Sequence, residues 1–223
     1  NIDLMYGIPG MSISEWQENL NVLRQFPIPH LSAYHLSFEP KTVFNRYLAN
    51  GRLTPVDEEV SLQQYDLLLD YTDSLGYDNY EISNFALDHH YSRHNLGYWQ
   101  GKTYLGFGPS AHSYNGRVRR WNIAHNTKYT EAIAAGSNAY FETEQIDNQT
   151  AFNEYILTAL RTKWGISETF TARNFGLELV ESLKKNIVRF QEEGLLLKTE
   201  DRYILTRRGK LISDFIMREF MIT

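Results

Sequence analysis

The sequence contains no cysteine among its 223 residues. Without thiols the chain can form no disulfide, no cysteine-type zinc site and no iron–sulfur cluster held by its own residues. It also has no apolar run near the ~20 residues that a membrane-spanning helix requires, and no charged and then apolar leader typical of a signal peptide. We therefore expect neither a membrane span nor an export signal.

Proline and histidine are absent from the last part of the chain. All six prolines precede Ser110, and all seven histidines lie between His30 and His125. Residues 150–223 carry 12 basic and 10 acidic residues, whereas the remainder carries 10 basic and 17 acidic residues. This change of composition predicts two domains, residues 1–145 and 146–223, with a polar boundary between them.

The N-terminal pattern predicts a parallel pair of strands. Residues 2–6 are typical of a buried strand, and residues 31–36 predict a second one. Between them Ser12 and Glu15 have the spacing of a capping box, which starts a helix. A strand, a helix and a strand in this order favour a right-handed crossover, with polar groups collected at the carboxyl ends of the strands.

The rest of the chain predicts one more strand and then a mostly helical module. A helix is expected between Pro55 and Gly76, a short strand at residues 80–85, and functional loops at 88–121. Helices are predicted near 151–163, 167–175 and 177–193, followed by a hairpin at 195–206 and a last helix after Thr206. The fold class is therefore α/β, with a winged-helix-like module at the C-terminus.

Asp3 is an acid inside an apolar strand. A buried carboxylate needs a hydrogen-bonding partner or a ligand hydroxyl, because unpaired burial costs several kcal/mol. From the residue alone, a structural carboxylate that accepts nearby backbone N–H groups is favoured over a binding role.

The histidines do not form a standard metal pattern. His89, His90, His94 and His112 match no zinc spacing and are supported by no cysteine. Residues 94–99 (HNLGYW) combine an imidazole with two aromatic rings, which suits an iron porphyrin. An exposed histidine beside a packed Tyr–Trp pair explains the same residues.

Two further segments have an ordinary explanation. Residues 106–113 are rich in glycine but have neither phosphate-loop nor dinucleotide-binding spacing, so a tight turn explains them as well as a ligand does. The basic residues on and after the hairpin would meet DNA phosphates in a winged helix, although a solvated face is favoured in an acidic chain. These basic residues are Arg202, Arg207, Arg208 and Lys210.

Taken in order, several segments resemble the oxygen-independent coproporphyrinogen III oxidase family, the HemN/HemW group of radical S-adenosylmethionine proteins. The matching segments are residues 3–10 (DLMYGIPG), 30–36 (HLSAYHL), 80–86 (YEISNFA), 92–95 (SRHN) and 104–113 (YLGFGPSAHS). The resemblance covers almost the whole chain and corresponds to the C-terminal part of the family's proteins.

The resemblance implies the end of a partial (β/α)6 barrel followed by the family's winged-helix-like domain. It also implies S-adenosylmethionine and a 4Fe-4S cluster, whose CxxxCxxC ligands would lie outside this chain, so the fragment alone should be inactive. The family's S-adenosylmethionine contacts correspond to Asp3, to Ser37 through its backbone, and to His112. Ser37 and His112 differ in residue type from the oxidase proper.

Within the family, residues 94–99 resemble the HNxxYW motif of HemW-like heme chaperones. By this resemblance His94, Asn95, Tyr98 and Trp99 bind heme, and His94 is the expected ligand of the heme iron. The expected function is delivery of heme to acceptor proteins. The alternatives are a coproporphyrinogen oxidase that makes protoporphyrinogen, and a nucleic-acid-binding winged helix.

The resemblance also sets expectations for partners and location. We expect heme or porphyrinogen as ligand, heme-acceptor proteins as partners, no nucleic acid, and a cytoplasmic protein. Peripheral membrane association and a homodimer both stay open at this point.

Overall fold

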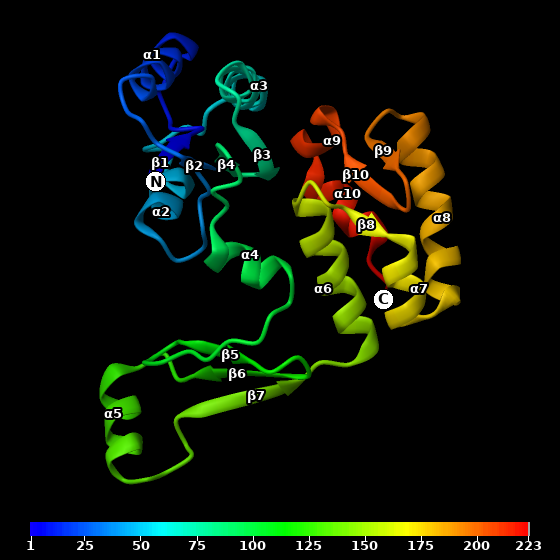
Figure 1. Cartoon of the computed structure of the whole chain (residues 1–223). Helices are drawn as coiled ribbons and strands as arrows, with labels where there is room; N and C mark the ends of the chain where they lie inside the picture. The colour runs from blue at the N-terminus through cyan, green and yellow to red at the C-terminus, as the bar shows by residue number, and fades with distance from the viewer. Residues whose placement is uncertain (223) are drawn as a thin grey trace. The chain divides into compact units, whose positions relative to one another are not determined.

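The computed structural model describes residues 1–222 (Figure 1), and these residues divide into two compact units. Among the described residues, the first unit holds residues 1–92 and 207–211, and the second holds residues 93–206 and 212–222. Both units mix helices and strands. Within the described residues, no helix combines the length and the apolar character that crossing a bilayer requires.

The first unit is built on a four-stranded sheet with the order β1-β2-β4-β3. β1 runs parallel to β2, and β4 is antiparallel to both of its neighbours. This arrangement confirms the predicted strand–helix–strand crossover. The elements of this unit are β1 (Ile2–Tyr6), α1 (Ile13–Leu23), β2 (His30–His35), α2 (Val43–Ala49), α3 (Glu58–Ser74), β3 (Asp78–Glu81), β4 (Asn84–Ala86) and α9 (Arg207–Leu211).

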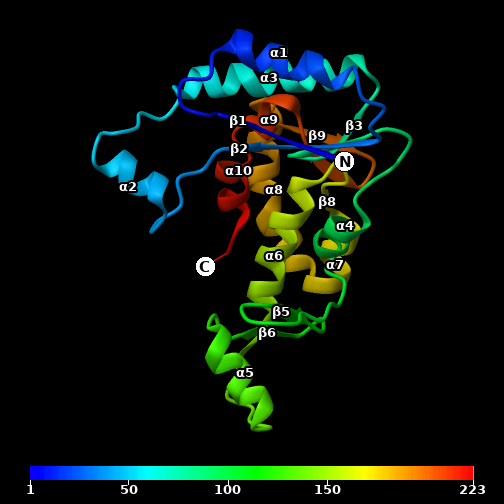
Figure 2. The same ribbon diagram turned by 90° about the vertical axis from the view of Figure 1, so that its left-hand side faces the viewer.

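Helix α1 begins where the sequence predicts. Ser12 accepts a hydrogen bond from the backbone N–H of Glu15, and the Glu15 carboxylate accepts one from the backbone N–H of Ser12. The helix buries Trp16 and Leu20 completely. Helices α1 and α3 lie side by side (Figure 2), and the core of this unit lies where they pack against the sheet.

Strand β1 is covered on one face only, so the prediction of a buried strand is wrong. Ile2, Leu4 and Tyr6 belong to the core, whereas Asp3 is exposed and Met5 is 46% exposed. Successive strand residues point to opposite faces, and helices cover only one of them. Asp3 is therefore not the buried carboxylate that the sequence predicts.

The single strand predicted at residues 80–85 is a tight hairpin of β3 and β4. The Glu81 carboxylate accepts hydrogen bonds from the Ser83 backbone N–H at 3.0 Å and from the Asn84 side-chain amide at 2.5 Å. Glu81 is 1% exposed, so these contacts satisfy a buried acid. The side chain of Glu81 thus closes the turn that divides the predicted strand in two.

The second unit contains two three-stranded antiparallel sheets, β5-β6-β7 and β8-β10-β9. Arg119 of β6 forms an ion pair with Glu154 of α6 at 2.6 Å. The elements are α4 (Arg93–Trp99), β5 (His112–Tyr114), β6 (Val118–Asn122), α5 (Asn126–Ala134), β7 (Phe141–Gln145), α6 (Asn148–Arg161), β8 (Ile166–Ser167), α7 (Glu168–Phe175), α8 (Leu177–Glu192), β9 (Leu196–Thr199), β10 (Arg202–Leu205) and α10 (Ser213–Phe220).

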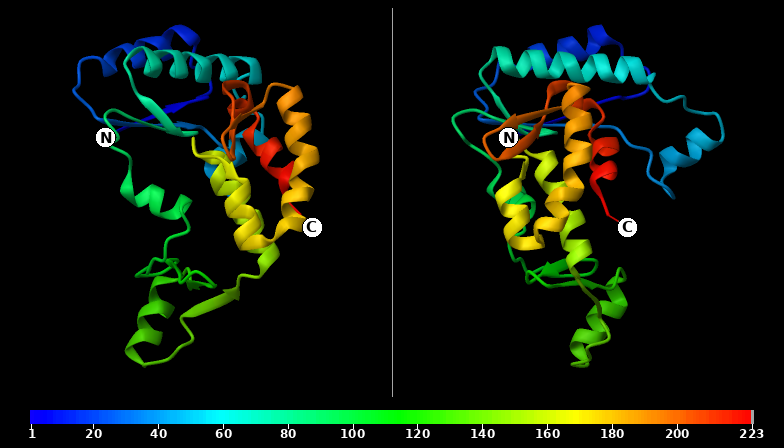
Figure 3. Two further views of the ribbon diagram at one scale, coloured as in Figure 1. Left: turned by 45° about the vertical axis from the view of Figure 1, so that its right-hand side comes forward. Right: turned by 90° about the vertical axis from the view of Figure 1, so that its right-hand side faces the viewer.

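The predicted helices and hairpin of the C-terminal region are confirmed. Helix α8 buries the apolar face formed by Leu183, Ile187 and Phe190, and α8 and α10 lie side by side (Figure 3). The single last helix expected after Thr206 is instead two helices, because the backbone leaves helical geometry at Ile212.

Candidate functional site

Helix α4 presents His94 and Tyr98 together at the surface. The two residues are four positions apart, which places them on one face of the helix. Their rings are edge to face, with centroids 4.9 Å apart, and Tyr98 is 40% exposed. Within residues 1–222, neither ring nitrogen of His94 has a hydrogen-bond partner. An exposed imidazole with accessible nitrogens can bind a metal that a ligand brings.

Asn95 and Trp99 lie on a different side of α4 and are partly buried. The Arg161 guanidinium lies over the Trp99 ring, 5.1 Å from its centroid. The indole nitrogen of Trp99 is buried and has no hydrogen-bond partner in the described part of the chain. Trp99 thus packs α4 against Arg161 of the same unit, while His94 and Tyr98 are exposed.

Tyr104 extends the aromatic contact and was not among the predicted site residues. Its ring meets Tyr98 edge to face with centroids 4.8 Å apart, and the centroid of the Tyr114 ring lies 6.1 Å from that of Tyr104. The only signal in the sequence is an aromatic residue soon after the HNxxYW motif. Contact between the rings depends on the turn that follows α4, which spacing alone does not reveal.

His112 lies on β5 and is exposed. Its ring stacks on Trp121 of β6 with centroids 6.2 Å apart. A Cβ on Gly106 would lie 2.1 Å from the His112 carbonyl oxygen, so this loop approaches β5 closely. Among the described residues, no group of three or more His, Asp or Glu side chains could hold a metal ion.

Asp3 and Ser37 belong to the first unit and are both exposed. Asp3 accepts a hydrogen bond from the Asn1 side-chain amide at 2.6 Å, and Ser37 donates one to the Glu39 carboxylate at 2.9 Å. In the parallel register Asp3 lies opposite Ser32, whereas Ser37 follows the end of β2. The two predicted cofactor contacts are therefore separated along the strand direction.

A buried glutamine fixes the turn after β1. Gln64 is fully buried and accepts a hydrogen bond from the Gly7 backbone N–H at 2.8 Å. The side-chain amide N–H of Gln64 donates to the Met11 backbone carbonyl, and the backbone carbonyl of Gln64 accepts a hydrogen bond from the Trp16 indole N–H. The backbone at the carboxyl end of β1 is therefore held rigidly by α3 and α1.

His35 lies at the end of β2, against this same turn. Its Nε2 is hydrogen-bonded to the Ser61 hydroxyl at 2.6 Å, and its ring packs edge to face against Tyr6. Burial lowers the pKa of His35 below its ordinary value, and a hydrogen bond with Leu36 partly opposes this. The packed imidazole therefore favours its neutral form.

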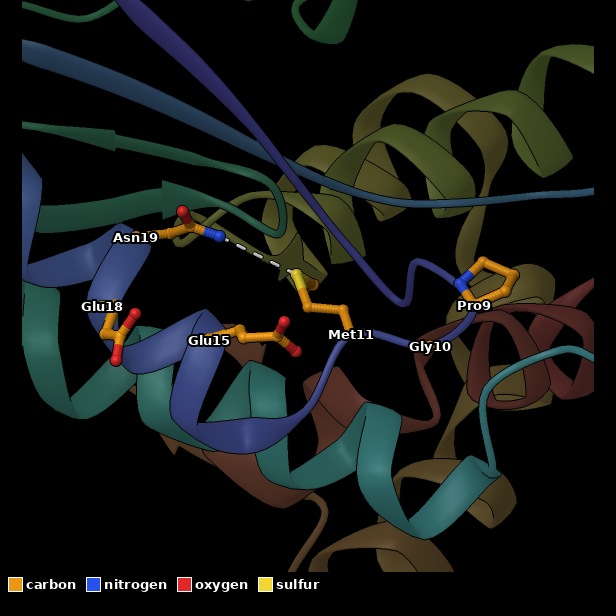
Figure 4. Close-up of a pocket in the computed structure, with 6 residues that line it drawn as sticks. All are labelled: Pro9, Gly10, Met11, Glu15, Glu18 and Asn19. Carbon is orange, nitrogen blue, oxygen red and sulfur yellow. Dashed lines mark hydrogen bonds between the residues drawn. The ribbon is translucent and has the colours of Figure 1, made fainter.

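A shallow hollow lies beside the start of α1 (Figure 4). The Glu15 carboxylate in it is already bonded to Ser12, and the Asn19 amide lies 3.8 Å from the Met11 sulfur. It contains none of the predicted site residues, so it does not define the candidate site. Its lining residues are Pro9, Gly10, Met11, Glu15, Glu18 and Asn19.

Two of the basic residues after the hairpin have partners within the first unit: Arg207 is exposed, as a solvated face predicts, whereas Lys210 is only partly exposed. Arg207 binds the carboxylates of Asp66 and Asp70 on α3. Lys210 donates to the Asn79 side-chain oxygen, and burial lowers its pKa. Phosphate contacts from these two side chains would require breaking those interactions.

Comparison with known proteins supports the resemblance seen in the sequence. Residues 146–212 match the family model described as the HemN C-terminal domain. The heme chaperone HemW of Bacillus subtilis is 31% identical over 221 residues, which is 99% of this chain and 58% of that protein. The heme chaperone HemW of Mycobacterium tuberculosis is 32% identical over 221 residues, 99% of this chain and 55% of that protein.

The fold matches a solved structure of the same group. Coproporphyrinogen III oxidase (HemN) from Escherichia coli, a radical SAM enzyme, superposes with a TM-score of 0.76 at 17% identity. The match covers 99% of this chain and 54% of that chain, so the present chain spans somewhat more than half of the proteins that it matches. The match shows that the chain has a mixed α/β fold like that of the corresponding part of this enzyme. The proteins that the chain matches in sequence and in fold are thus members of the HemN/HemW group.

Proposed function

We propose that this chain is part of a heme chaperone of the HemW type, which binds heme and delivers it to acceptor proteins. One observation carries the proposal. Helix α4 exposes His94 and Tyr98 of the HNxxYW motif, in a chain that is similar over 99% of its length to proteins named heme chaperone HemW.

His94 is the residue that would ligate the heme iron. Imidazole is a common axial ligand of heme, and a bound heme would supply the iron centre. The accessible ring nitrogens of His94 suit this role, and the edge-to-face contact with Tyr98 fixes the orientation of the imidazole. Asn95, Tyr98 and Trp99 of the same motif are the other proposed heme-binding residues, and Trp99 also packs against Arg161.

S-adenosylmethionine and the 4Fe-4S cluster belong to the same proposal for the whole protein. Asp3 is exposed and offers carboxylate oxygens that accept hydroxyl or ammonium groups, so it suits the ligand. Ser37 and His112 are the other proposed contacts. The chain contains no cysteine, so the cluster's thiolate ligands would come from outside it.

We also propose the finer description of the fold. Residues 1–145 would be the end of a partial (β/α)6 barrel with the ligand loops, and residues 146–223 a winged-helix-like domain. Thr223 itself lies outside the described residues. The parallel β1–β2 pair supports the first assignment. The match of residues 146–212 to the HemN C-terminal domain, and the sheet β8-β10-β9, support the second.

The test is a titration of hemin into the chain, followed by the Soret absorbance. We expect saturable binding by the wild type and at least about a tenfold loss of affinity in His94→Ala, together with loss of the ligated Soret signature. His90→Ala removes another exposed imidazole and serves as the matched control. Equal binding by wild type and His94→Ala would show that His94 is not the ligand.

The two alternatives are separated by other measurements. A coproporphyrinogen oxidase would remove two propionate carboxyls when the whole, cluster-loaded protein is assayed, and efficient turnover without heme binding would contradict a chaperone. A nucleic-acid binder would shift DNA in a gel with a steep salt dependence. We expect no shift, because Arg207 and Lys210 are engaged within the first unit.

A further inference from the structure

The loop that follows α4 holds two large apolar side chains out in solvent. Leu105 is 67% exposed and Phe107 is 82% exposed. Single exposed apolar residues are common, but two on one short loop form a patch that the fold itself does not use. The loop belongs to the same unit as His94 and Tyr98.

The loop is fixed in shape rather than free to collapse. The Gly106 backbone N–H donates to the Ser113 hydroxyl at 3.0 Å, and the Asn122 amide donates to the Gly108 carbonyl at 2.9 Å. Gly106 also fits so closely against β5 that it has no room for a side chain. The apolar side chains on either side of Gly106 are therefore displayed by a rigid backbone.

Ring contacts join this loop to the proposed heme ligand. His94 meets Tyr98, and Tyr98 meets Tyr104 at 4.8 Å, the residue immediately before Leu105. Tyr104 thus connects the ring contacts of α4 to the start of the apolar loop. A ligand held at His94 that is planar, large and apolar would extend over neighbouring apolar side chains.

Two cations lie at the ends of the same helix. Arg93 begins α4, and Lys102 follows it, with its backbone N–H bonded to the Gly97 carbonyl at 2.9 Å. A Cβ on Gly97 would lie 3.9 Å from the Lys102 Cδ, so the lysine side chain runs along α4. Neither cation has an ion-pair partner within residues 1–222. Unpaired cations beside an apolar surface suit a ligand with carboxylates.

We infer that Leu105 and Phe107 form the apolar wall of a tetrapyrrole site at His94, and that Arg93 and Lys102 bind the propionates of the ring. This inference rests on the proposed function and names further ligand-binding residues for it. The occupant is a porphyrin that carries both an apolar ring and carboxylates.

The first test compares hemin affinity in the wild type and in the double variant Leu105→Ser/Phe107→Ser. Burying two large apolar side chains is worth at least about a tenfold change in Kd, so the double variant should bind at least that much more weakly. Its Soret position at saturation should match the wild type, because His94 is retained. Leu177→Ser, at a position 72% exposed on α8, is the matched control and should bind normally.

The second test uses hemin dimethyl ester, in which the propionates carry no charge. The wild type should prefer hemin over the diester, and Arg93→Ala/Lys102→Ala should lose that preference. Thermal melting of each variant verifies that these surface substitutions leave the fold intact. A preference that survives the substitution would overturn the assignment of the two cations.

The possible failures are distinct. No saturable hemin binding by the wild type would overturn the proposed function and this inference together. Wild-type binding with an unaffected Leu105→Ser/Phe107→Ser variant would overturn the inference alone. Unchanged hemin affinity combined with lost transfer to an acceptor would also overturn it, and would assign the loop to a protein partner.

Discussion

Two glycines of the second unit have the same backbone strain but differ in whether a side chain would clash with neighbouring atoms. Gly165 and Gly136 both have a φ of 63°, a conformation that L side chains rarely adopt. A Cβ on Gly165 would lie 2.0 Å from the Tyr203 carbonyl oxygen, whereas nothing lies within 4 Å of one on Gly136. The first position therefore requires glycine for two reasons and the second for one.

We expect Gly136→Ala to reduce the free energy of unfolding by about 1–2 kcal/mol, the usual cost of left-handed backbone. Gly165→Ala should cost at least about 2 kcal/mol more, because the backbone of β10 cannot yield as a flexible side chain can. Chemical denaturation of both variants measures the difference. Equal losses at the two positions would show that the contact with Tyr203 relaxes without cost.

Local spacing predicted which residues share a surface, but not how far each is buried. His94 and Tyr98 are four residues apart on a helix, and the structure brings their rings together. Asp3 was expected to be buried because its neighbours are apolar, yet it is exposed. Burial depends on whether a second layer covers that face of the sheet. The residues of the strand alone do not allow this to be predicted.

At the scale of elements, His35 connects β2 to α3 and to the turn after β1. Its ring atoms occupy the space that a Cβ on Gly7 would need, with Nε2 only 2.5 Å from that position. Burial lowers its pKa from the ordinary value of 6.5. The unfolded chain therefore takes up a proton at a higher pH than the folded protein does.

Because the pKa of His35 is lower in the folded protein, we expect the free energy of unfolding to have its full value above about pH 6.5. It should decline as the pH falls below that value. His35→Gln keeps a hydrogen-bonding side chain near Ser61 but removes the titrating group, so its stability should depend less on pH. Unfolding by urea from pH 7.5 to 5 measures both. His90→Gln removes a loop imidazole and should behave as the wild type, and a His35→Gln slope equal to the wild type would contradict the account.

Helices and the C-terminal hairpin were predictable because their signals are local. Capping residues such as Ser12, and apolar faces such as that of α8, are recognised from the residue types within one short segment of the sequence. The β3–β4 hairpin was missed because a buried Glu81 side chain, and not a glycine or proline, closes its turn. Helix α2 was missed because none of its residues is buried, so it has no apolar face turned to the core.

At the scale of the whole molecule, the composition of the sequence changes near residue 146, and the match to the HemN C-terminal domain covers residues 146–212. The compact units divide differently, because residues 207–211 join the first unit although their neighbours on both sides belong to the second. Contacts between residues more than 100 positions apart decide this, such as that between Arg207 and Asp66. No local pattern in the sequence reveals such a contact.

Arg207 is the residue that we expect to hold α9 to the first unit. It binds Asp66 at 2.7 Å and also reaches Asp70, whose pKa it lowers by hydrogen bonding. These groups are largely exposed, so solvent screening limits the whole network to roughly 1 kcal/mol. Arg207→Met should therefore raise amide hydrogen exchange in α9 by about fivefold at low salt.

High salt should weaken the same contact in the wild type, because exposed ion pairs are screened beyond about 3 Å at 1 M ionic strength. The exchange rates of wild type and Arg207→Met should therefore converge at 1 M salt. Arg173→Met is the control and should leave exchange in α9 unchanged, because Arg173 is an exposed cation of α7 with no ion pair among the described residues. If α9 exchanges equally in wild type and Arg207→Met at low salt, apolar packing of Leu211 against the core holds the helix instead.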